Sequence, residues 1–146
     1  IGWSMWLGGD IPVRRGVKSS ANDAMSICAR YLGRGVPIMM FPEGTRSTSE
    51  EMLPFKSGAF RLAVEAGVPL VPIAVERTRS ALPKFGWRLG KSRAVVTAGE
   101  PISTAGHSVE NLEPLMDEGR KAIEALRSQL RARLKGLDAD PSPCDP

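Results

Sequence analysis

Three short apolar runs, separated by stretches with helical periodicity, constrain the fold of this chain more than any other feature. They cover residues 36–41, 70–75 and 94–98. The first, VPIMMF, is bounded by Gly35 and Pro42, as is typical of a strand buried on both faces. Strands that alternate with helices favour an α/β fold with a mostly parallel sheet flanked by helices. Such sheets bind ligands in loops beyond the carboxyl ends of their strands.

Helical periodicity predicts three helices. They run from Ser20 or Asn22 to about Leu32, over residues 58–65, and from Pro114 to about Leu134. Apolar residues of the third helix recur every three or four positions, so we expect one face to pack on the core and the basic outer face to be solvated. Cys28 is expected to be a buried free thiol. With 146 residues the chain suits one domain, predicted over 1–137 with a flexible tail at 138–146.

The loop after the first apolar run carries the most informative motif, FPEGTRS, at residues 41–47. Gly44 lets the backbone approach a ligand closely. Thr45 and Ser47 offer hydroxyl groups, and Arg46 offers a planar fork that matches phosphate. Glu43 can accept a hydrogen bond from a polyol hydroxyl or orient the arginine. The motif is therefore suited to hold a phosphorylated polyol.

Lys56 follows nine residues after Ser47, at the start of the second predicted helix. Free backbone N–H groups at a helix start attract anions, so this position extends the candidate phosphate site. Two other interpretations stay open from the residues alone. Glu43 and Arg46 could pair with each other on the loop, and Lys56 could be an ordinary surface lysine.

Four blocks of the sequence, in order, resemble those of the 1-acylglycerol-3-phosphate acyltransferases and their glycerolipid acyltransferase relatives. They are GWSMW (2–6) with GDIPVRRG (9–16), FPEGTRS (41–47), FKSG (55–58) and VPIAV (71–75). The resemblance extends from residue 1 to about residue 102. The resemblance places Arg15 at the arginine that ends the family's second block. The alternative is that Arg14 and Arg15 form an exposed basic pair.

The resemblance implies direct acyl transfer, from acyl-CoA or acyl-carrier protein to the free hydroxyl of 1-acylglycerol 3-phosphate. The substrate-binding residues would be Arg15, Glu43, Gly44, Thr45, Arg46, Ser47 and Lys56. In the family a histidine four residues before an aspartate acts as general base. No metal and no bound cofactor is implied, because the acyl carrier is a substrate.

The chain departs from the family at the catalytic base. Its one histidine is His107, expected in an exposed loop, and Asn111 stands four residues later. The His-x4-Asp block belongs upstream of Gly2, so we expect an N-terminally truncated domain with no catalytic residue and no turnover on its own. The alternatives are a non-catalytic phospholipid- or phosphate-binding module, or acylation of another acceptor such as glycerol 3-phosphate or a lyso-ornithine lipid.

The distribution of basic and apolar residues indicates which partners the protein could bind. The net charge is +4, and residues 77–93 hold six Lys or Arg and no acid, interleaved with Leu82, Phe85, Trp87 and Leu89. Such a stretch suits an anionic membrane surface, although a solvated loop explains it equally well. No nucleic-acid-binding signature accompanies it, so no nucleic acid partner is expected. We expect the protein at the cytoplasmic face of the membrane, peripheral or anchored through upstream segments.

Overall fold

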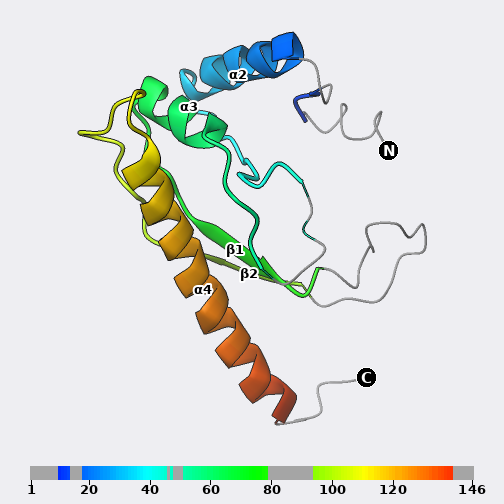
Figure 1. The fold of residues 1–146 in the computed structure, drawn as a ribbon. Helices are drawn as coiled ribbons and strands as arrows, with labels where there is room; N and C mark the ends of the chain where they lie inside the picture. Colours follow the sequence, from blue (N-terminus) through cyan, green and yellow to red (C-terminus); the bar gives the residue numbers. More distant parts are fainter. Residues whose placement is uncertain (1–9, 14–17, 46, 48–50, 79–93, 140–146) are drawn as a thin grey trace.

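The computed structural model describes residues 10–13, 18–45, 47, 51–78 and 94–139 (Figure 1). The elements, in chain order, are α2 (Lys18–Leu32), α3 (Gly58–Ala66), β1 (Ile73–Glu76), β2 (Val95–Ala98) and α4 (Glu113–Ala139). All three predicted helices are confirmed. The last one continues to Ala139, about one turn beyond the predicted end and into the stretch that was expected to be tail.

The two strands run antiparallel. Ile73 pairs with Ala98 and Val75 with Val96, and a bridge between Leu70 and Ile102 continues the pairing. The predicted mostly parallel sheet is not confirmed in the described part of the chain. Apolar runs indicate that strands exist but carry no information about their direction, and the connection between these strands is long enough for either arrangement.

α4 covers one face of this sheet, and no described helix covers the other. Ala74 is buried, and the Glu76 carboxylate binds the α4 side chains Arg127 (2.7 Å) and Arg131 (3.2 Å). On the opposite face Val75 is 37% exposed and its partner Val96 is 60% exposed. The predicted strands at 70–75 and 94–98 are thus present in shortened form, but only one face is buried.

Residues 36–41 do not form the strand predicted for them. The segment has no regular secondary structure, and among the described residues no strand pairs with it. Met39 is 66% exposed and Phe41 is 76% exposed. The prediction of a strand buried on both faces is therefore wrong for this structure. An apolar run needs neighbouring strands for its burial, and sequence periodicity does not show where those strands come from.

The core lies between α3, α4 and the segment that follows β2. Phe60, Ile102 and Leu115 form its centre, and Leu115 is fully buried. A Cβ atom on Gly119 would lie 2.9 Å from the Phe60 ring, so this glycine lets α4 pass close to α3. The core therefore holds α4 beside α3, the helix that follows the FPEGTRS loop.

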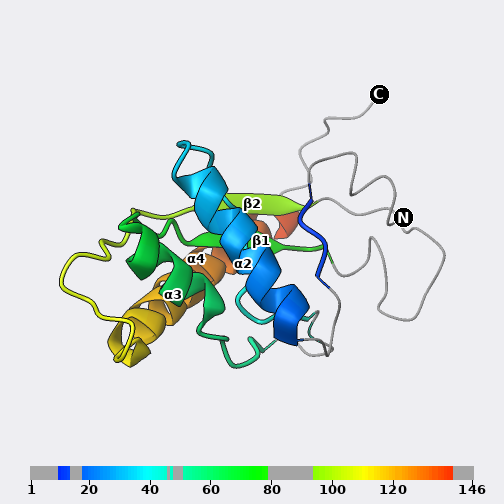
Figure 2. The same ribbon diagram turned by 90° about the horizontal axis from the view of Figure 1, so that it is seen from above.

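The remaining features of the fold concern the three helices. α2 packs against α3 (Figure 2) and buries Ala24 and Cys28, which confirms the expected buried thiol. α3 ends at Gly67, whose φ of 63° closes the helix in a left-handed conformation. Although α4 has 27 residues, neither it nor any other described helix is apolar enough over enough residues to cross a bilayer.

Candidate functional site

The first residues of the FPEGTRS motif form a tight turn, and Lys56 lies beside it. The amide of Gly44 donates to the Phe41 carbonyl at 3.0 Å, with Gly44 at a φ of 67°. The amide of Lys56 donates to the Pro42 carbonyl at 2.8 Å. This second bond joins the two ends of the loop, so that the start of α3 lies beside the motif.

The side chain of Lys56 lies over Gly44. A Cβ atom placed on Gly44 would be 2.9 Å from Lys56 Nζ and 3.0 Å from its Cε. Only glycine leaves this space to the lysine side chain without a shift. The structure thus brings together two predicted binding residues from the two ends of the loop.

Glu43 has a structural partner within the loop. Its Oε2 accepts a hydrogen bond of 3.0 Å from the Leu53 amide, and the side chain is half-buried. The carboxylate is therefore held in place without any ligand. Its predicted bond to an acceptor hydroxyl stays a prediction, and so does a Glu43–Arg46 pair.

Of the other predicted binding residues, the structure describes two and leaves two undescribed. Thr45 is exposed, and Ser47 Oγ donates to the Glu51 carbonyl at 3.2 Å. Arg15 and Arg46 lie outside the described residues. Glu43, Gly44, Thr45, Ser47 and Lys56 thus belong to one loop, and the two arginines keep their roles as predictions.

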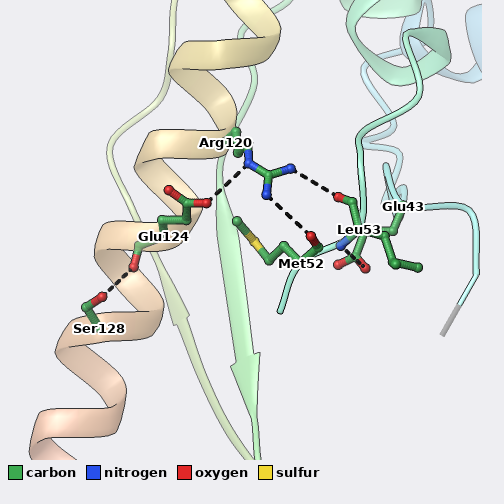
Figure 3. Close-up of polar contacts among 6 residues, drawn as sticks. All are labelled: Glu43, Met52, Leu53, Arg120, Glu124 and Ser128. Carbon is green, nitrogen blue, oxygen red and sulfur yellow. Dashed lines mark hydrogen bonds and ion pairs between the residues drawn. The ribbon is translucent and has the colours of Figure 1, made fainter. Parts of the chain in front are cut away.

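Arg120 of α4 is the residue of this region that the sequence analysis missed. Its Nη1 donates to the Leu53 carbonyl at 3.2 Å and its Nη2 to the Met52 carbonyl at 3.3 Å (Figure 3). Its Nε binds Glu124 at 3.2 Å, and the guanidinium lies 5.6 Å from the centre of the Phe55 ring. The basic outer face of α4 was interpreted as solvated, and the spacing of Arg120 and Glu124 was the only available signal.

Arg120 and Glu43 therefore both form hydrogen bonds with the backbone of Leu53. Its carbonyl accepts from Arg120 and its amide donates to Glu43 (Figure 3). Phe55 also stacks on the core residue Phe60 with ring centroids 6.1 Å apart. Segment 52–56 is thus tied to α4 on one side and to the motif on the other.

His107 lies in the loop before α4, as expected, but it is half-buried and not exposed; its amide donates to the Thr104 carbonyl at 3.2 Å. Two shallow depressions, of about 340 and 580 Å³, lie along the 99–105 segment of the described structure. Neither is lined by a predicted binding residue. The candidate site is therefore the exposed motif loop itself, with a glycine turn, hydroxyl groups and a lysine beside a helix start.

Comparisons with known proteins show the family to which this chain is similar. The family model described as Acyltransferase matches residues 1–76. A 1-acyl-sn-glycerol-3-phosphate acyltransferase of Chlamydomonas reinhardtii is 35% identical over 98% of this chain and 41% of its own length. One of Haemophilus influenzae is 35% identical over 75% of this chain and 45% of its own length.

A solved structure is also similar. The crystal structure of the 1-acyl-sn-glycerophosphate acyltransferase PlsC from Thermotoga maritima superposes with a TM-score of 0.66 at 30% identity, over 75% of this chain and 44% of that protein. The chain spans less than half of the length of each of these three relatives.

Proposed function

This chain belongs to the acyltransferase family, and from that premise we propose that the protein transfers an acyl group to the free hydroxyl of 1-acylglycerol 3-phosphate, making phosphatidate. The donor is an acyl thioester of coenzyme A or of acyl-carrier protein. The hydroxyl oxygen forms the new ester bond to the acyl carbon, the carbon–sulfur bond breaks, and the thiol leaves with a proton. No metal or resident cofactor is part of this proposal.

The observation that carries the proposal is the position of Lys56 over Gly44 inside the motif loop. An ammonium group at this point, directly before α3, suits the phosphate of the acceptor. The Ser57 side chain makes no cap bond to the start of α3, and the N-terminal end of a helix favours a bound anion. Arg15 and Arg46 are proposed as further phosphate contacts, and Glu43, Thr45 and Ser47 as contacts to the glycerol part.

We propose that the general base is not among these 146 residues. The single histidine, His107, is followed by Asn111 four residues later and not by aspartate. It lies in the loop before α4, whereas the proposed acceptor residues lie in the motif loop. The chain alone should therefore bind the acceptor without turning it over, which an assay with acyl-CoA and lysophosphatidate tests directly.

A lipid acceptor implies work at a membrane surface. We propose peripheral association with an anionic membrane at its cytoplasmic face, favoured by the net charge of +4. The alternative functions predict different results in binding and activity assays. A binding module would hold the phosphate without any catalysis in the whole protein, and a different acceptor would compete with lysophosphatidate.

The proposal is tested by lysophosphatidate binding in detergent micelles at moderate salt. Lys56→Ala and Arg46→Ala should each weaken binding about tenfold to a hundredfold, since a charge-assisted hydrogen bond contributes about 1.5–3 kcal/mol. Lys135→Ala is the matched control, because it removes an exposed lysine near the end of α4. Equal affinity of all four proteins would refute the assignment. Competition with glycerol 3-phosphate and a lyso-ornithine lipid then identifies the preferred acceptor.

A further inference from the structure

We infer that Arg120 is a positioning residue of the acceptor site. It holds the return segment of the motif loop, residues 52–53, against α4 and thereby sets the position of the Glu43 carboxylate. This inference rests on the proposed function, because it assumes that the loop binds the acceptor. The hydrogen bonds of Arg120 to the loop do not depend on that assumption.

The geometry of Arg120 is that of a clamp on two consecutive carbonyl groups. Nη1 reaches the Leu53 oxygen at 3.2 Å and Nη2 the Met52 oxygen at 3.3 Å. A planar guanidinium can donate to both oxygens at once, whereas the single ammonium of lysine has no such fork. The Phe55 ring lies 5.6 Å from the guanidinium and adds a contact that also requires a flat cation.

The same contacts show that Arg120 acts on the loop and not on a ligand. Each of its three guanidinium nitrogens has a protein acceptor, since Nε binds Glu124 at 3.2 Å. Its side chain is 36% exposed, so it is partly covered by the segment that it holds. A phosphate bound by Arg120 would have to replace these bonds.

The clamp reaches the motif through the Leu53 peptide. The Leu53 amide donates to Glu43 Oε2 at 3.0 Å, and three residues later the Lys56 amide donates to the Pro42 carbonyl at 2.8 Å. If segment 52–53 detaches from α4, both bonds lose their fixed geometry. The fraction of molecules with Glu43 and Lys56 correctly placed then falls, and apparent affinity falls by the same factor.

Arg127 provides a matched control on the same helix. It also joins α4 to another element, because its Nε binds the Glu76 carboxylate of β1 at 2.7 Å. Replacing either arginine weakens the attachment of α4. Only replacement of Arg120 should disturb the loop.

The first experiment needs no ligand. Amide hydrogen exchange of Leu53 is measured by NMR, with the Ile102 amide, which donates to the Leu70 carbonyl at 2.7 Å, as the reference for the core. Arg120→Lys and Arg120→Ala should lower the protection of Leu53 relative to Ile102 by about tenfold. Arg127→Ala should leave this ratio unchanged. An unchanged ratio in Arg120→Lys would overturn the clamp.

The second experiment measures lysophosphatidate affinity in micelles. Arg120→Lys and Glu43→Ala should each raise the Kd about tenfold, and the double variant should be little weaker than either one, because both act through Leu53. Arg127→Ala should bind as the wild type does. Wild-type affinity in Arg120→Lys would show that charge alone matters and would overturn the positioning role.

The two proposals fail in different ways. If Lys56→Ala weakens binding and Arg120→Lys does not, the acceptor site stands and the positioning role is refuted. If the wild-type chain does not bind lysophosphatidate, the proposed function fails, and the positioning role toward that acceptor fails with it. The exchange experiment still decides in that case whether Arg120 holds the loop.

Discussion

The replacement Gly44→Ala separates backbone strain from the placement of Lys56. Gly44 has a φ of 67°, a conformation in which an L-residue with a Cβ atom costs about 1–2 kcal/mol. The new Cβ would also lie 2.9 Å from Lys56 Nζ and 3.1 Å from its Cδ. The backbone of the turn is held by the bond to Phe41, so the flexible end of the lysine should be the part that moves away.

Two separate losses follow from this geometry. The free energy of unfolding should fall by about 1–2 kcal/mol because of the left-handed backbone. Lysophosphatidate affinity should fall by a further tenfold to hundredfold, since moving the ammonium removes a charge-assisted bond of about 1.5–3 kcal/mol.

Gly35→Ala is the control for the backbone term. Gly35 has a φ of 75°, and a Cβ placed there would meet nothing within 4 Å. Urea unfolding should show similar destabilisation of the two variants, whereas binding in micelles should be weakened only by Gly44→Ala. If Gly44→Ala binds like Gly35→Ala, Lys56 does not contact the acceptor from its position over Gly44.

Three further predictions concern the frame around the site. Glu76→Gln removes the charge bound by Arg127 and Arg131 and should lower the free energy of unfolding by about 1–3 kcal/mol; a difference from wild type that does not shrink in high salt would contradict the ionic origin. Leu115→Ala empties a fully buried site and should cost about 2–5 kcal/mol in urea unfolding, and a loss below about 1 kcal/mol would show that this part of the core is not well packed. Burial raises the pKa of the Cys28 thiol above its ordinary value, so its contribution to stability should be complete below the unfolded-state pKa and fall as pH rises through the folded-state pKa. In a Cys144→Ser background, iodoacetamide at pH 8 should therefore modify the native protein much more slowly than the unfolded one, and equal rates would refute the burial of this thiol.

Local signals in the sequence predicted the helices well. α3 (Gly58–Ala66) agrees within one residue with the helix predicted over 58–65, and α4 begins at Glu113, one residue before the proline that marks its first turn. Both signals act over a few residues, so they do not depend on the rest of the chain. The grouping of Lys56 with the motif was also predictable, because the helix start follows the loop directly.

Long-range features were not predictable in the same way. The strand direction of β1 and β2 and the exposure of Phe41 depend on which segments meet in space, and an apolar run reports only its own composition. The role of Arg120 depends on the backbone carbonyls of Met52 and Leu53, and backbone acceptors leave no mark in a sequence.

The tie between Arg120 and Leu53 joins residues 67 positions apart, and this has a practical consequence for protein engineering. A shortened version ending after β2 would retain every predicted binding residue and all of the recognisable motif blocks. It would nevertheless lose the helix that holds the return segment of the loop. Minimal versions of this domain should therefore be cut after α4, however little that helix contributes to the motifs.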